Sequence, residues 1–306
     1  KKQPLFPQAT YFPFQSSIHH PLLQHVSGGE KKKGAVVFQG LIHRGIRDGW
    51  LDDHIVNGHV VFPGAAYMDM AFAALHRLDP DAAPQLSDVH IVQPMVVEPG
   101  DDEKLGVECS VMTERGRLVI ASRGGPVESV RGPGPRKSGT KHMFSDFKHG
   151  PKNNGSKLLP QAEDMVTAIK SRCCEAVGPM EEWYMTMRQQ GLAYGDRFRA
   201  IQEAYRGEDE ILGRLVLGGT DDGRDKHHAV HPCMLDGLFQ LAGVLMSSGE
   251  VGALEGPFVP AFVKSATLLA PYSYTCGDKM WGHVYNVKQK DSETVADCGL
   301  YNDGGE

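Results

Sequence analysis

Cysteine is scarce in this sequence, with six among 306 residues, and no two of them form a Cys-x-x-Cys pair. Without such a pair, the sequence does not predict a zinc ribbon or a thioredoxin-type redox motif. Six scattered cysteines in a chain of this length are also unlike a disulfide scaffold, which is usually a short secreted domain. We therefore expect a reduced, cytoplasmic protein without a metal site.

Long apolar runs, a leader segment and an excess of positive charge are also lacking. No stretch approaches the roughly 18 consecutive apolar residues of a membrane-spanning helix. The first residues, KKQPLFPQATYFPFQ, have neither an initiator Met nor an apolar core, so they do not predict a signal peptide. The formal net charge of −6 argues against a nucleic-acid partner. We expect no membrane partner, and we interpret the chain as a segment excised from a longer protein.

One segment, RGPGPRKSGTKHMFSDFKHGPKNNGSK, is dense in Gly, Pro, Lys, Asn and Ser and predicts a linker. It divides the chain into an N-terminal unit (1–135), a linker (136–160) and a C-terminal unit (161–306). Runs rich in β-branched residues predict most strands, and amphipathic runs predict two helices. The expected strands are 34–43, 88–97, 104–113, 117–122, 210–217, 258–269, 280–288 and 294–301, and the two helices are 161–177 and 180–190.

Each half contains one almost wholly apolar run that begins at a proline. The first runs from Pro63 to Leu75 and has Asp69 as its main polar residue, and the second follows Pro232 as far as Met246. Proline suits the first position of a helix, and a helix that is apolar on all sides is buried. The shared pattern predicts a duplicated unit with a sheet wrapped around one central helix.

The second apolar helix carries Asp236 and Gln240, which are four residues apart and therefore lie on one face. A buried carboxyl group has a raised pKa unless it is paired, and the amide one turn away can hold it in place. The alternative is a satisfied core aspartate, although Asp236 lies too far into the helix to be a cap.

The first half carries His54, Gly58, Pro63 and Gly64 in the pattern His-x3-Gly-x4-Pro-Gly. A histidine before a turn is often only structural, but the context is informative here. Glycine permits a tight turn, and the first amides of a helix can bind a developing oxyanion. Because imidazole titrates near neutral pH, His54 can take up a proton.

These motifs resemble those of the dehydratase domains of fatty acid synthases and polyketide synthases. LDDHIVNGHVVFPGAAYMDMA resembles the family's His-x3-Gly-x4-Pro motif, and HPCMLDGLFQ resembles its second catalytic motif. WYMTMRQQGLAYGDRFRAIQ resembles the Tyr-Gly-Pro segment, and GPFVPAFVKSATLL the closing strand. The resemblance spans Pro4 to about Tyr301 and is to a dehydratase domain of an animal fatty-acid-synthase-like polyketide synthase or a type I fatty acid synthase.

The resemblance implies an α+β double hot-dog fold, with two antiparallel sheets each wrapped around a central helix. It also implies elimination of water from a 3-hydroxyacyl thioester to give a trans-2-enoyl thioester. By matched position His54 is the base and Asp236 the acid. The implied substrate-binding residues are Gly58, Pro63, Gly64, Tyr194, Gly195 and Gln240. Asp196 stands where the family usually has proline, which puts the neighbouring contact of Tyr194 in doubt.

The same resemblance implies no cofactor and no metal, because the substrate is carried on the phosphopantetheine of an acyl carrier protein. The partners would be that carrier protein and the neighbouring synthase domains, with a homodimer formed through the parent synthase.

Three alternatives stay open at this point. One is a product-template domain, which has the same fold and a wide chamber in place of a linear acyl tunnel. The others are an inactive structural domain of this type and a non-catalytic acyl-binding module.

Two further residue pairs carry no functional prediction. We interpret His227-His228 as a solvated turn and Cys173-Cys174 as packing residues.

Overall fold

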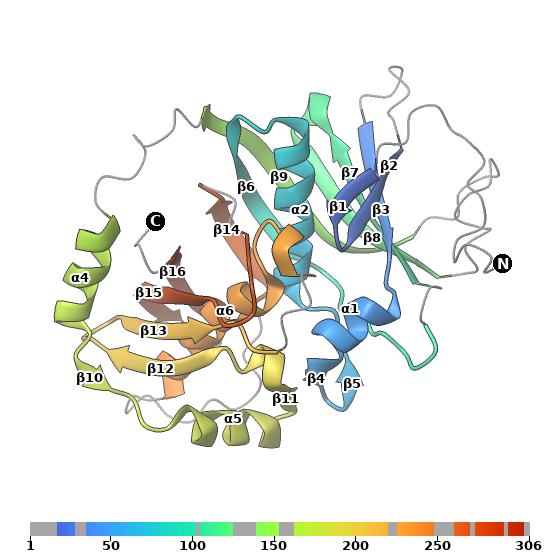
Figure 1. Cartoon of the computed structure of the whole chain (residues 1–306). Coiled ribbons are helices and arrows are strands. Elements are labelled where there is room, and N and C mark those ends of the chain that lie inside the picture. The colour runs from blue at the N-terminus through green and yellow to red at the C-terminus, as the bar shows by residue number, and fades with distance from the viewer. Residues whose placement is uncertain are drawn as a thin grey trace.

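The computed structural model describes residues 17–27, 35–101, 105–124, 139–152, 162–219, 225–247, 260–269, 273–290 and 293–302. In this part of the chain two large antiparallel sheets each lie against one long helix, α2 (Gly64–Leu78) or α6 (Pro232–Ser247). Figure 1 shows the two groups of strands, with α2 beside the first and α6 beside the second. The double hot-dog prediction is confirmed.

The first sheet has eight strands in the order β1-β2-β3-β7-β8-β9-β6-β14, and α2 packs against its middle. The strands are β1 Ser17–His20, β2 Leu23–Ser27, β3 Ala35–Leu41, β6 Ala82–Ile91, β7 Leu105–Met112, β8 Arg117–Gly124, β9 Thr140–Lys152 and β14 Phe262–Thr267. Four alanines of α2 are fully buried, so the helix backbone can lie close to the sheet.

The second sheet has five strands in the order β10-β12-β13-β15-β16, and α6 packs against it. The strands are β10 Glu175–Ala176, β12 Ile201–Arg206, β13 Ile211–Val216, β15 Lys279–Lys290 and β16 Glu293–Asn302. Here the strands supply the small residues, because α6 is rich in leucine. A Cβ atom on Gly213 would lie 2.4 Å from Leu241 Cδ2, and one on Gly282 would lie 2.7 Å from Leu241 Cδ1.

A third, small sheet joins the two units in the order β11-β4-β5. Strands β4 (His54–Val56) and β5 (His59–Val60) come from the first half of the chain, and β11 (Leu192–Tyr194) comes from the second. Helices α2 and α6 also contact each other directly. The remaining helices are α1 Arg44–Gly49, α4 Ala162–Arg172 and α5 Met180–Gln189. Among the described residues, no helix combines the length and the apolar character needed to cross a membrane.

The predicted linker (136–160) is wrong where the structure describes it, because most of that region is strand β9, which pairs with β8 and β6. The composition hides a period of two: Met143, Ser145 and Phe147 are buried, whereas Phe144 and Asp146 are partly exposed and Lys148 is exposed. Strand β14, from the predicted C-terminal unit, also pairs with β6 of the first sheet. The chain therefore crosses between units, which the predicted boundaries do not capture. Residues 136–138 and 153–160 of the predicted linker lie outside the described residues.

Candidate active site

His54 is carried at the start of a tight hairpin. Strands β4 and β5 pair through Val56 and His59, so Asn57-Gly58 forms a two-residue turn. Both turn residues have positive φ, 50° for Asn57 and 81° for Gly58, as a type I′ hairpin turn requires. Gly58 is exposed at this turn, so its function is to shape the hairpin and not to line the site.

The hydrogen bonding of His54 leaves one ring nitrogen available as a base. Nδ1 lies 2.6 Å from the carbonyl oxygen of Val61, which can only accept, so the proton is on Nδ1. The lone pair is then on Nε2. The ring is buried against Phe198, at 4.9 Å between centroids, and against Tyr194, at 6.0 Å. These contacts hold Nε2 in a fixed direction.

Asp236 is buried in α6, with 6% of its surface exposed. Burial raises the pKa of its carboxyl group above the usual value, and the charge of His54 and the hydrogen bond from Gln240 offset only part of this effect. Tyr194 packs against His54 and lines the same pocket as Asp236, so the two groups lie at one site although they come from different hot-dog units. The site therefore combines an imidazole that has a free ring nitrogen with a carboxyl group that retains its proton to higher pH.

Gln240 is held so that its amide nitrogen faces Asp236. Its Nε2 donates to Asp236 Oδ2 at 2.8 Å and to the carbonyl oxygen of Phe198 at 3.0 Å. Its Oε1 accepts from the hydroxyl of Tyr184 at 3.1 Å. The Tyr184 oxygen in turn accepts a hydrogen bond from the backbone N–H of Ile201. The hydroxyl proton of Tyr184 therefore points to Gln240. Because Oδ2 of Asp236 is an acceptor in this chain of bonds, the acidic proton belongs on Oδ1.

A narrow pocket of about 20 Å³ lies beside Asp236. Tyr194, Gln240 and Pro260 line it near the carboxyl group. Gly64, the first residue of α2, is close by, since a Cβ atom there would lie 3.8 Å from Pro260 Cγ and 2.6 Å from Ile91 Cδ1. A side chain at position 64 would therefore displace the end of the Ile91 side chain, and the extended backbone of Pro63 (φ −71°, ψ 147°) starts the helix.

Two family profiles match the chain, one in each half. A profile described as polyketide synthase dehydratase domain matches residues 20–123, and a profile described as polyketide synthase dehydratase N-terminal domain matches residues 161–306. Their matched regions contain His54 and Asp236 respectively.

The chain belongs to the polyketide synthase dehydratase family. The family's reaction is dehydration of 3-hydroxyacyl thioesters.

Similar curated proteins are much longer than this dehydratase. Polyketide synthase PksM of Bacillus subtilis (strain 168) is 23% identical over 91% of this chain and 6% of its own length. Fusarin C synthetase of Gibberella moniliformis is 24% identical over 82% of this chain and 6% of its own length. Highly reducing polyketide synthase alnA of Emericella nidulans is 27% identical over 76% of this chain and 10% of its own length. The chain therefore spans a small part of each of these relatives.

Solved structures of similar fold are also dehydratase domains. The dehydratase domain from the CurJ module of curacin polyketide synthase superposes with a TM-score of 0.75 at 20% identity, covering 94% of this chain and 92% of that one. GphF dehydratase 1 superposes with a TM-score of 0.71 at 24% identity, covering 93% of each chain. These likenesses support the double hot-dog architecture described above.

The structure brings some of the predicted site residues together and places others apart. Tyr194 lies opposite His54 in the β4–β11 pairing and lines the pocket. Burial and the charge of Asp236 raise the pKa of Tyr194 well above its usual value, so the phenol stays protonated. Gly195 shapes the loop, since its N–H donates to Asp53 O at 2.8 Å and a Cβ atom would overlap the Asp53 side chain. Asp196, at the departure from the family pattern, is exposed.

The sequence analysis missed how the residues next to His54 and α6 are connected. The carboxylate of Asp53 accepts from the backbone N–H of Arg197 at 2.8 Å, and the guanidinium of Arg197 donates to Asp225 at 2.6 Å. His231, just before α6, donates from Nε2 to the same Asp225 oxygen at 3.1 Å. Burial lowers the pKa of His231 to about 4, so it is neutral here. The chain of contacts ties the His54 strand to the start of the Asp236 helix.

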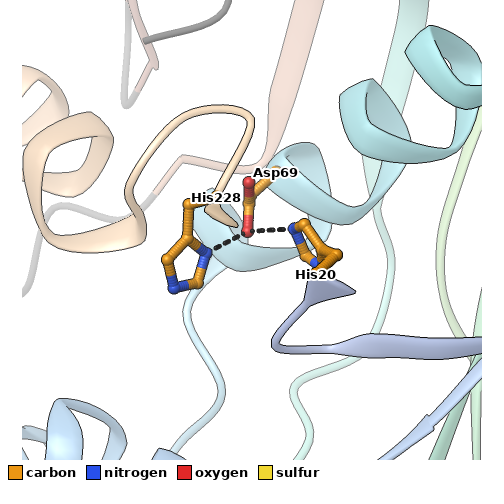
Figure 2. A group of neighbouring side chains, drawn as sticks. All are labelled: His20, Asp69 and His228. Atoms are coloured by element: carbon orange, nitrogen blue, oxygen red, sulfur yellow. Dashed lines mark hydrogen bonds and ion pairs between the residues drawn. The ribbon is translucent and has the colours of Figure 1, made fainter. Parts of the chain in front are cut away.

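Asp69 is the polar residue of α2 and forms a second buried anchor between the units. Figure 2 shows its carboxylate between His20 and His228. Oδ2 lies 3.0 Å from His20 Nε2 and 2.6 Å from His228 Nδ1, and Oδ1 accepts from the backbone N–H groups of Ala229 and Val230 at 2.8 and 3.1 Å. The prediction of a solvated turn at His227-His228 is therefore wrong for His228, which is only 4% exposed.

We call His20, Asp69 and His228 the Asp69 anchor. The hydrogen bonds within it do not fit a metal site. The backbone N–H of Leu22 donates to His20 Nδ1 at 3.2 Å, so the proton of the neutral ring is on Nε2, facing Asp69. A metal ligand would need a lone pair at that atom. Burial alone would raise the pKa of Asp69, but the two histidines hold it below the usual value. The anchor is thus a carboxylate satisfied by four donors.

Replacing Asp69 by alanine will destabilise the dehydratase by about 3–5 kcal/mol, because two buried histidines and two backbone N–H groups lose their acceptor. Urea unfolding followed by circular dichroism measures this loss. Asp79→Ala is the matched control, since its carboxylate is half-exposed and lies 3.8 Å from His149. Equal unfolding midpoints for the two variants would contradict the role given to Asp69.

Proposed function

We propose that this dehydratase removes water from a 3-hydroxyacyl thioester and gives the trans-2-enoyl thioester, with His54 as base and Asp236 as acid. The supporting observation is the free Nε2 of His54 beside a buried carboxyl group of raised pKa. The elimination requires one group that takes the C2 proton and one that gives a proton to the C3 hydroxyl, and this pair supplies both.

The proton transfers balance within this pair of residues. His54 Nε2 takes the C2 proton, and the C2–H electrons form the double bond to C3. The C3–O bond breaks as the hydroxyl group takes the proton of Asp236, and water leaves. The site then holds an imidazolium and a carboxylate, and one proton returns from His54 to Asp236 before the next turnover.

The start of α2 is suited to the thioester carbonyl. The first N–H groups of a helix have no partner within the helix and carry partial positive charge. Gly64 is the first residue of α2 and lies close to the pocket beside Asp236. Its N–H would stabilise the enolate-like oxygen that develops when C2 loses its proton. The nearby hydroxyl of Tyr194 would orient the C3 hydroxyl group.

Known relatives and the residues that line the pocket beside Asp236 support this proposal over the alternatives. A His-to-Phe mutant and an Asp-to-Asn mutant of the CurK dehydratase are each described as inactive. Apolar side chains such as Met187, Leu192 and Phe239 line the pocket beside Asp236, which suits an acyl chain. A structural or acyl-binding domain would have no use for the arrangement that keeps His54 Nε2 free and Asp236 desolvated.

The substrate would arrive on the phosphopantetheine of an acyl carrier protein, and the reaction as written needs no cofactor. Neighbouring domains of a multidomain synthase would supply and consume the thioester, as the length of the relatives suggests. A homodimer would then form through the parent synthase.

The decisive test is dehydration of 3-hydroxybutyryl-pantetheine by the wild-type chain, followed as loss of one water by mass spectrometry. Both hydroxyl configurations and a carrier-protein thioester belong in the same series. We expect enoyl product from one configuration. Inertness toward all of them, with a folded protein, would overturn the proposed reaction.

Tyr184→Phe will lower kcat about five-fold, the effect of losing one buried hydrogen bond of about 1 kcal/mol, because Gln240 loses the donor that fixes its orientation. KM will change little. The control is Tyr205→Phe, whose hydroxyl donates to exposed Glu203 on the surface. Steady-state kinetics on 3-hydroxybutyryl-pantetheine measures kcat and KM for both variants. An equal loss of kcat in the two would argue against a role for Tyr184.

A further inference from the structure

Asp236, Gln240, Gly243 and Ser247 follow one another along a single face of α6. Their spacing of four, three and four residues is that of a helical stripe. The acid is at one end of the stripe, and Ser247 is about 16 Å further along the helix axis. The pocket beside Asp236 extends along this stripe as far as Gly243.

Trp183 of α5 lies across the far end of the stripe. Its Nε1 donates to the hydroxyl of Ser247 at 3.1 Å. A Cβ atom on Gly243 would lie 3.3 Å from Trp183 Cζ2, so the missing side chain leaves room for the indole ring. Tyr184, the next residue along the chain, packs edge-on against the same indole at 5.1 Å between centroids. Three contacts therefore fix the position of the ring.

The indole separates two cavities. On one side is the narrow pocket with Asp236, of about 20 Å³. On the other is a groove of about 370 Å³ between the start of α5 and the end of α6, lined in part by Val177, Met180 and Val244. Trp183 lines both. Because both cavities include Trp183 in their lining, we expect removal of the indole ring to join them.

We propose that Trp183 closes the distal end of the acyl pocket and thereby limits the length of the acyl chain that this dehydratase accepts. The inference rests on the proposed function, which places the thioester carbonyl at Gly64 and the C3 hydroxyl at Asp236. The chain beyond C3 then leads away from Gly64, along the stripe of α6. Gly243 is about 10 Å along the axis from Asp236, so the indole stands where the end of a medium-length chain would lie.

The test compares kcat/KM over a series of straight-chain 3-hydroxyacyl-pantetheines from four to twelve carbons. In the wild type the ratio will fall once the chain reaches the indole. Trp183→Ala will raise the efficiency on long substrates relative to the four-carbon one by about ten-fold, equivalent to two further methylene groups entering the opened space. A profile identical to wild type would overturn the proposal.

Two further variants separate pocket size from folding. Gly243→Ala adds a methyl group against the indole and will shift the profile toward shorter chains, and alanine is a good residue for a helix interior. Ser247→Ala removes only the hydrogen bond to the indole and will give a partial shift toward longer chains. The control is Trp281→Phe, a tryptophan of β15 that packs between Lys170 and Arg214 and should leave the profile as in the wild type.

The two hypotheses fail in different ways. If the wild type dehydrates no substrate of any length, the proposed reaction is wrong. If the wild type and Trp183→Ala both dehydrate the four-carbon substrate and their length profiles coincide, the reaction stands and the role of Trp183 is wrong.

Discussion

Replacement of His54 by alanine will lower kcat for dehydration by about 10²- to 10⁴-fold, the range that a positioned general base contributes. The reason is that Nε2 of His54 carries the free lone pair, while Nδ1 is committed to the carbonyl oxygen of Val61. KM should change far less than kcat, because the base acts on the C2 proton in the transition state. Single-turnover measurement of enoyl product gives the rate directly.

His59→Ala is the matched control, since His59 belongs to the same hairpin but is exposed on β5. It should retain nearly full activity. Circular dichroism must show that both variants are folded. If His54→Ala keeps more than about a tenth of the wild-type rate, a loss far below what a general base contributes, another group removes the C2 proton.

Asp236→Asn will lower kcat by a similar factor of about 10² to 10⁴ because the amide cannot donate a carboxyl proton to the leaving hydroxyl group. The same change should raise Tm by a few degrees. Burial raises the pKa of Asp236, so the ionised carboxylate is disfavoured in the folded state at neutral pH. Asparagine has no charge to bury and can still accept the hydrogen bond from Gln240. Thermal unfolding and steady-state kinetics on one preparation check both parts.

The sign of the pH dependence follows from the same raised pKa. The contribution of Asp236 to stability is complete below the ordinary pKa of an unfolded aspartate and declines as the pH rises toward the raised folded value. Activity should likewise fall at high pH as Asp236 loses its proton. Asp196→Asn, at an exposed carboxylate, should change neither profile. An Asp236→Asn variant with the wild-type high-pH limb would show that another group is the acid.

Local patterns in the sequence predicted the two central helices and about half of the described strands. The run after Pro63 and the run after Pro232 have no polar face, and each became the buried helix of one hot-dog unit. The spacing of Asp236 and Gln240 predicted a hydrogen bond between them, which the structure contains at 2.8 Å. Periodicity and propensity are local properties, so they can be read without knowing what packs against them.

Strand β9 shows where composition misleads. Its segment is rich in Gly, Lys and Ser, and a linker was the natural prediction, yet Met143 and Phe147 pack into the core on alternate positions. The pairing with β6 and β8 satisfies its backbone, and those strands are distant in the sequence. Likewise, nothing local indicates that β14 returns to the first sheet.

The sequence by itself indicated the two buried helices, a tight turn at Gly58 and the candidate acid and base, because each depends on residues close together in the chain. Only the tertiary structure decided which nitrogen of His54 is free, how Tyr184 orients Gln240, that His228 is buried on Asp69 and that Trp183 lines the pocket beside Asp236. Each of these is a contact between distant segments, and its partners become neighbours only when the two units pack together.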